Sequence, residues 1–172
     1  MRSAELLMDG FDRINEVVHE VVEGLTPEQL VFRVDAEANS IAWLVWHLTR
    51  VEDDHVAEVA NAEQVWTSKG WIERFGLPFG ASEHGYGHSS QDVAAVRVSS
   101  GDLLIGYYDD VHDETVKYVA GLTDPDFDRI VDRRWDPPVT LGVRLISVIA
   151  DGLQHAGQAA FIRGVVERTW PG

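Results

Sequence analysis

The chain has 172 residues, enough for one domain, and 29 acidic against 14 basic side chains give it a formal net charge of −15. An acidic excess of this size excludes a nucleic-acid backbone and an anionic membrane surface as partners, because both attract basic patches. The sequence contains no cysteine, which excludes disulfides, thiolate metal sites and a cysteine nucleophile. Any metal ion must therefore be held by histidines and carboxylates.

The N-terminal residues run directly into an amphipathic pattern, and no stretch approaches 18 uninterrupted apolar residues. We therefore expect a cytoplasmic protein in which residues 1–172 form a single domain. A small molecule is the expected kind of partner.

The first predicted helix ends near Gly24 and is defined by apolar residues three or four positions apart. They are Leu7, Phe11, Ile14, Val18, Val21 and Leu25. Residues 26–29, Thr-Pro-Glu-Gln, combine a capping box with proline in the first helical position and predict a short helical turn.

The second predicted helix begins near Asn39 or Ser40, since either side chain can cap a first turn, and it fades between residues 60 and 66. Its apolar face also carries two histidines and is flanked by two tryptophans. These residues are Trp43, Leu44, Trp46, His47, Leu48, Val51 and His55.

Two further helices follow with the same spacing. The third begins after residues 99–102 and ends at Gly121, and the fourth runs from about Thr140 to Arg168. Four amphipathic helices predict an all-α fold, a four-helix bundle with long crossover connections. We interpret residues 75–91 as a functional loop that packs down as a lid, and residues 124–138 as a crossover between the last two helices.

Three polar residues on the predicted helices point to a metal site. Asp151 and His155 stand four residues apart, so both project from one face of the fourth helix, and His47 lies within the apolar face of the second. Burying such groups singly is costly, whereas a shared divalent cation satisfies all of them. Two histidines and one carboxylate leave coordination positions open, as in catalytic zinc and non-haem iron sites, and nickel or manganese also fits.

The residues alone leave two other interpretations open for this group. Asp151 and His155 also make an ordinary pair on one helix, and His47 is also compatible with a hydrogen-bonded core histidine.

Residues 41–55, IAWLVWHLTRVEDDH, and residues 151–158, DGLQHAGQ, resemble the second-helix and fourth-helix motifs of the DinB/YfiT-like superfamily. The resemblance covers essentially the whole chain and implies a four-helix bundle, a homodimer and a metal triad at His47, Asp151 and His155. Many members have histidine where this chain has Asp151. The superfamily includes mycothiol and bacillithiol S-transferases and maleylpyruvate isomerase-like proteins, so the resemblance implies chemistry on a small thiol such as mycothiol, bacillithiol or glutathione.

We expect a bound divalent metal to activate the thiol, with Trp43 and Trp46 as walls of the pocket. Gln158 lies near His155 on the fourth helix, where a hydrogen bond at the site or a helix contact would fit equally. The same triad also suits a metal-dependent hydrolase, and a third hypothesis is a non-catalytic dimer with a metal-free core cluster.

Other polar clusters have weaker patterns. His84 and His88 lie in a glycine-rich loop, where spacing does not fix geometry, so exposure to solvent is expected. Residues 109–113 carry Asp109, His112 and Asp113 on one helical face, and we interpret that face as a solvated acidic surface rather than a second cation site. Asp54 is a possible partner of a ligand imidazole, and both it and His55 are expected to be exposed.

Overall fold

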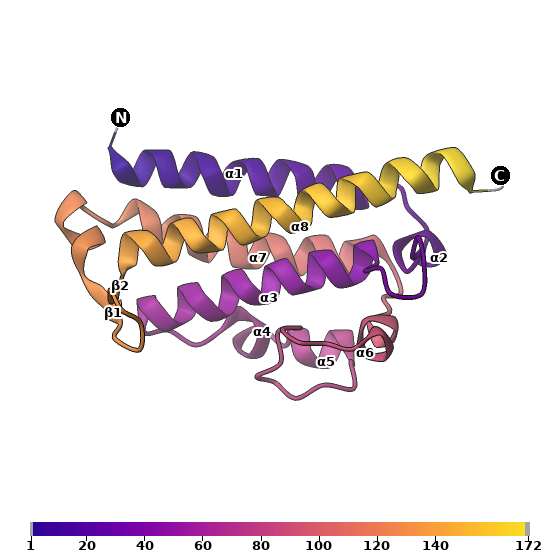
Figure 1. Ribbon diagram of the computed structural model, residues 1–172, viewed down its shortest axis with the longest axis horizontal. Helices are drawn as coiled ribbons and strands as arrows, with labels where there is room; N and C mark the ends of the chain where they lie inside the picture. The colour runs from indigo at the N-terminus through magenta and orange to yellow at the C-terminus, as the bar shows by residue number, and fades with distance from the viewer. Residues whose placement is uncertain (1, 171–172) are drawn as a thin grey trace.

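The structure is a computed structural model that describes residues 2–170, and four long helices lying side by side dominate it (Figure 1). They are α1 (Ser3–Val22), α3 (Ile41–Ala60), α7 (Gly101–Ala120) and α8 (Leu141–Thr169). The predicted all-α four-helix bundle is confirmed. α3 packs against both α7 and α8, and α1 packs against the same two helices.

The helix ends lie where capping residues were predicted. Ser40 accepts a hydrogen bond from the Trp43 backbone N–H, and Thr140 accepts one from Val143, so both satisfy free donors of a first turn. The predicted turn is α2 (Pro27–Leu30), whose Thr26 and Gln29 form the reciprocal capping box.

The predicted apolar faces of the long helices form one continuous core. Small residues allow α8 to approach α1 closely, because a methyl group on Gly152 would lie 2.8 Å from the Ile14 Cδ1 atom. Residues 41–50 of α3 are buried on every side. Their outward face must therefore be covered by a segment outside the four long helices.

That cover comes from residues 61–100, which contain three short helices that the sequence analysis did not predict: α4 (Val65–Ser68), α5 (Trp71–Phe75) and α6 (Ser90–Ala95). Within the predicted loop, Leu77 and Phe79 pack against the core, whereas Tyr86 is exposed. The loop therefore packs down onto the bundle as predicted.

The crossover between α7 and α8 is also more regular than predicted. It contains a 3₁₀ helix, η1 (Asp124–Asp128), and a small antiparallel sheet in which β1 (Ile130–Asp132) pairs with β2 (Val139–Thr140). Across residues 2–170, no helix combines the length and apolar character needed to cross a bilayer.

Candidate metal centre

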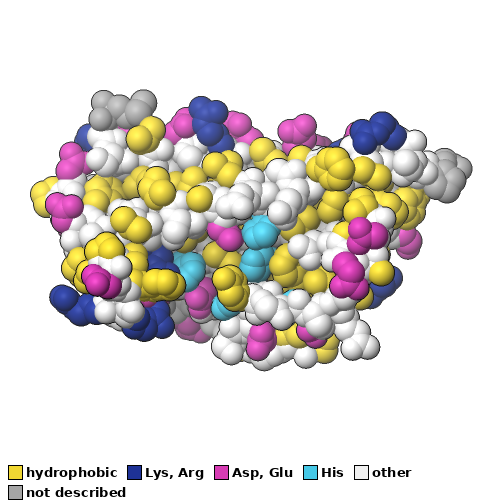
Figure 2. Space-filling view, in the orientation of Figure 1, with side chains coloured by type: hydrophobic (Ala, Val, Ile, Leu, Met, Phe, Trp, Pro, Cys, Tyr) yellow, Lys and Arg dark blue, Asp and Glu magenta, His cyan; other side chains and the backbone are white. Residues whose placement is uncertain are grey.

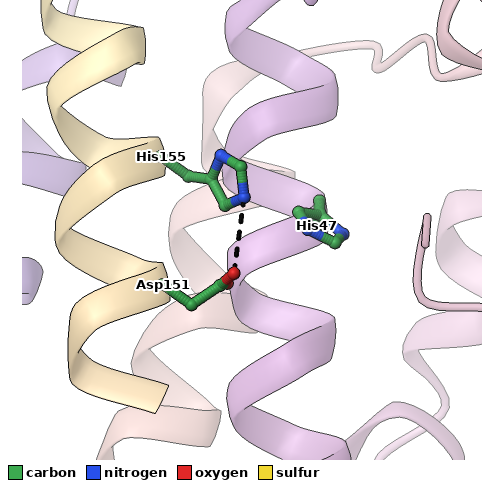
Figure 3. A group of neighbouring side chains, drawn as sticks. All are labelled: His47, Asp151 and His155. Atoms are coloured by element: carbon green, nitrogen blue, oxygen red, sulfur yellow. Dashed lines mark ion pairs between the residues drawn. The ribbon is translucent and has the colours of Figure 1, made fainter. Parts of the chain in front are cut away.

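The structure brings the three predicted residues together where α3 passes α8 (Figure 3). His47, Asp151 and His155 each offer one ligand atom, and these atoms lie within 4.8 Å of one another. The Nε2 atom of His155 is 3.6 Å from Oδ1 of Asp151. Ligand atoms of one ion at about 2 Å each are separated by roughly 3–4 Å, so small side-chain shifts would close the group around a cation.

The loop over α3 fixes the orientation of His47. Its Nδ1 atom donates a hydrogen bond to the His84 carbonyl, which leaves Nε2 as the nitrogen available for a ligand. Arg50, fully buried one turn along α3, holds the same loop by donating to the carbonyl oxygens of Glu83 (3.0 Å) and Ala81 (3.2 Å).

Gly85 allows the loop to lie this close to the histidine. Its φ of +95° is a conformation that residues with side chains rarely adopt. A Cβ atom there would lie 2.7 Å from His47 Nδ1 and 3.1 Å from Trp43 Cζ2. A close approach to a residue 38 positions earlier leaves no local pattern, so the sequence indicates only that Gly85 belongs to a glycine-rich loop.

Trp43 and Trp46 lie in the core beside His47, and their role as walls for a bound substrate stays a prediction. Both are buried behind the site, where Trp43 stacks on the His47 imidazole with ring centroids 4.6 Å apart. Trp46 stacks on His88, which is 3.2 Å from the Trp43 indole nitrogen. The tryptophans therefore support His47 and the loop from within the core, and His88 is part of this packing instead of being exposed.

On α8, the amide of Gln158 orients His155. Its Oε1 atom lies 2.9 Å from Nδ1 of the imidazole and accepts a hydrogen bond from the Nδ1–H group, so Nε2 faces Asp151. The second carboxylate oxygen, Oδ2 of Asp151, is buried without a hydrogen-bond partner among the described residues. A buried carboxylate oxygen with no partner is costly, and a cation at the group would satisfy it.

The pKa values of His47 and Asp151 favour ligand forms, whereas that of His155 favours the imidazolium, which must lose a proton to bind a metal. Burial lowers the pKa of His47, so its imidazole is neutral, as a metal ligand must be. The hydrogen bond with Asp151 raises the pKa of His155. Burial acts to raise the pKa of Asp151, but its hydrogen bond with His155 and the neighbouring imidazoles lower the pKa overall, so the carboxylate is ionised.

A cavity of about 330 Å³ opens beside Asp151. Its walls come from α3, α8 and the loop, and its polar lining residues are Asp54, His55, His84, Tyr86, Ser147 and Asp151. In Figure 2, histidine side chains reach the surface in the middle of this face, among hydrophobic side chains. The candidate centre is therefore accessible to a small molecule.

The remaining predicted clusters have structural partners. Asp109 Oδ1 lies 2.7 Å from Nε2 of His19, and His112 lies 3.0 Å from Asp12, so these two residues join α7 to α1 rather than forming a second cation site, whereas Asp113 is exposed as predicted. Asp54 accepts a hydrogen bond from Gln64 at 2.7 Å and does not orient His47.

His55 was expected to be exposed, but it is partly buried and lies 3.0 Å from the Arg144 guanidinium. No local pattern could predict this contact, because Arg144 is 89 residues away and belongs to another helix.

Comparisons with known proteins identify relatives of this chain in sequence and in fold. A family model described as mycothiol-S-transferase matches residues 6–168. A crystal structure of a conserved protein from Enterococcus faecalis is similar to this chain, with a TM-score of 0.91 and 28% sequence identity over 98% of this chain and 99% of the other. No curated protein matches the sequence.

Proposed function

The chain belongs to the mycothiol-S-transferase family, and on that premise we propose that it is a metal-dependent enzyme that transfers or activates a low-molecular-weight thiol. Mycothiol is the thiol that the family description names, and bacillithiol and glutathione are the alternatives. We place the reaction in the cytoplasm, where such thiols are kept reduced.

One observation carries this proposal: a carboxylate oxygen of Asp151 is buried beside two imidazoles, with no hydrogen-bond partner in the part of the chain that the structure describes. A metal-free core cluster would leave that oxygen unsatisfied, whereas one divalent ion satisfies it and both Nε2 atoms. The donor set of two nitrogens and one oxygen suits Zn, Fe, Ni or Mn, and it leaves positions open for a substrate.

The residues at the site would have three separate roles: holding a metal ion, orienting its ligands and binding the substrate. A divalent ion held there supplies a Lewis acid that lowers the pKa of a thiol reaching it. The thiol must come from a substrate, because the chain has no cysteine. His84 and Gln158 hold the two imidazoles in their ligand orientation, and the 330 Å³ cavity offers His55, Tyr86 and Ser147 as hydrogen-bonding groups for a bound molecule.

We further propose that two copies associate through α8. Every exposed α8 residue between positions 143 and 161 is uncharged, although the chain has a net charge of −15. These residues are Val143, Ile146, Ser147, Ala150, Leu153, Gln154, Gly157, Gln158, Ala160 and Phe161. Depletion of charge with exposed apolar side chains is typical of the centre of an interface.

Sedimentation analysis of the wild type and of Leu153→Lys tests this association. We expect a dimer that the lysine converts to a monomer, and a monomeric wild type would contradict the proposal. Glu167→Lys, on the same helix beyond the uncharged face, is the control and should remain dimeric.

The enzymatic proposal is tested by incubating the metal-loaded protein with mycothiol, bacillithiol or glutathione and the electrophile 1-chloro-2,4-dinitrobenzene. We expect enzyme-dependent loss of thiol with one of the three, and loss of that activity in His47→Ala. Ester hydrolysis without thiol consumption would instead support the hydrolase alternative. Full metal loading with neither reaction would contradict both enzymatic hypotheses.

A further inference from the structure

A second cavity of about 610 Å³ lies on the side of α3 that faces α7 rather than α8. Its walls come from the C-terminal half of α3, from α4 and from α7. Its lining is largely apolar: Val56, Ala57, Ala60, Val111, Tyr118 and Leu122. The volume is within the range of small-molecule sites, and none of its lining residues belongs to the candidate metal centre.

Lysine is distributed very unevenly in this protein. The sequence contains two lysines, Lys69 and Lys117, and both line this cavity. Lys69 Nζ lies 3.0 Å from Asp110, and Lys117 Nζ lies 3.4 Å from Glu114. Both side chains are well exposed, so these ion pairs are weak and an incoming anion can compete for the ammonium groups.

The acidic residues of the cavity do not favour a cationic ligand. Asp53 already accepts hydrogen bonds from the backbone N–H groups of Val65 and Trp66, both at 2.8 Å, and from the Tyr107 hydroxyl at 2.7 Å. At the rim, Glu63 accepts a hydrogen bond from the Thr67 hydroxyl. The lysines are the cationic groups of the lining, and the carboxylate of a ligand would exchange with Asp110 and Glu114 as their partner.

We propose that this cavity binds a small apolar carboxylate of the fatty-acid type. The hydrocarbon part lies against the valine and alanine side chains of α3 and α7, where burial of apolar surface drives binding. The carboxylate pairs with the lysines at the rim, which are compact point charges on flexible stems. This site is separate from the proposed thiol chemistry and does not depend on it.

Decanoate is the probe, with decanol as the uncharged control of equal chain length, and binding is measured by calorimetry on the full-length protein. We expect saturable binding of one decanoate per chain. The double variant Lys69→Gln/Lys117→Gln should weaken decanoate binding about tenfold and leave decanol binding unchanged. Glu114→Gln should have the opposite effect and bind decanoate about threefold more tightly, because it frees Lys117 and removes a negative charge near the ligand carboxylate.

Two further variants locate the binding. Ala60→Phe, which fills the cavity, should abolish binding of both probes, whereas His47→Ala should bind decanoate with the affinity of the wild type. Absence of saturable decanoate binding, or equal effects of the lysine variant on both probes, would overturn the proposal. Retained binding in Ala60→Phe, or its loss in His47→Ala, would place the ligand elsewhere and overturn it equally. The lysine and Glu114 variants change only surface side chains, so the test does not depend on the folding of Ala60→Phe.

Discussion

Asp53 and Asp151 are both carboxylates held inside the bundle, one on each side of α3, but their surroundings differ. On the α7 side, Asp53 accepts two backbone N–H groups and the Tyr107 hydroxyl, with Arg50 at 3.5 Å. On the α8 side, Asp151 has one buried oxygen with no hydrogen-bond partner within residues 2–170 and two imidazoles nearby. The comparison separates a structural acid, whose burial the protein itself offsets, from an acid whose buried oxygen a bound cation would satisfy.

The largest expected effect on stability comes from removing the carboxylate of Asp53, the structural acid. Asp53→Asn removes the charge that faces the buried Arg50. It also replaces one carboxylate oxygen by an amide NH₂ group, although the carboxylate accepts hydrogen bonds from three donors. We expect the free energy of unfolding to fall by about 3–5 kcal/mol with the metal content of the folded protein unchanged. Chemical denaturation measures this, and Asp54→Asn, the partly exposed neighbour, should cost less than about 1 kcal/mol. Equal losses in both variants would show that the Asp53 contacts add nothing.

Asp151→Asn addresses the other side. The substitution removes one anionic ligand but breaks only the partly exposed ion pair with His155. We therefore expect the affinity for Zn²⁺ to fall at least about a hundredfold, while the free energy of unfolding changes by less than about 1 kcal/mol. Competition with a chromogenic chelator measures the affinity, and Glu167→Gln on the same helix serves as the control. A large stability loss with unchanged affinity would reverse the assignment of the two acids.

Glu52 provides a third case, because burial raises the pKa of this α3 carboxyl to about 7. The folded state therefore keeps a proton that the unfolded chain loses above pH 4.5, and stability falls as pH rises from about 4.5 to about 7. Glu52→Gln has no such proton to lose. It should be more stable than the wild type by about 2–3 kcal/mol at pH 8 and nearly equal at pH 4.5. Urea unfolding at both values tests this, and a pH-independent difference would contradict it.

The smallest expected effect concerns the support of the metal site. Gln158→Ala removes the acceptor that orients His155, and we expect metal affinity to fall about tenfold, within the range for groups that hold a ligand histidine. Gln154→Ala, one turn earlier and exposed, is the matched control and should bind metal as the wild type does. If both variants behave alike, the Gln158 contact does not position the ligand.

The sequence predicted the four long helices, because period and spacing fix which face of a helix each residue occupies. The meeting of His47 with Asp151 and His155 was implied by the resemblance to the DinB/YfiT-like superfamily, since the spacing alone also fits an ordinary helix pair. The sequence offered the hydrogen bond of Gln158 as one of two options, and it could not predict the supports that come from the loop. The His84 carbonyl and Gly85 act through the tertiary path of a loop, and backbone contacts of that kind leave no periodic pattern.

Partners of polar residues on different helices were missed for a related reason. His112 pairs with Asp12 across two helices, although its position in the sequence indicated a solvated face. A charged residue at the edge of an apolar stripe is exposed or paired depending on the residue that the neighbouring helix presents there, and helical spacing does not contain that information.

Elemental analysis of the wild-type protein, dialysed against Zn²⁺, Ni²⁺, Fe²⁺ or Mn²⁺ and then freed of excess metal, tests the metal centre most directly. We predict about one tightly held ion per chain for at least one of these metals, and none in His47→Ala. A wild-type protein that retains no ion would contradict the account, and so would a His47→Ala protein that retains as much metal as the wild type. Either result would show that Asp151 is not a metal ligand.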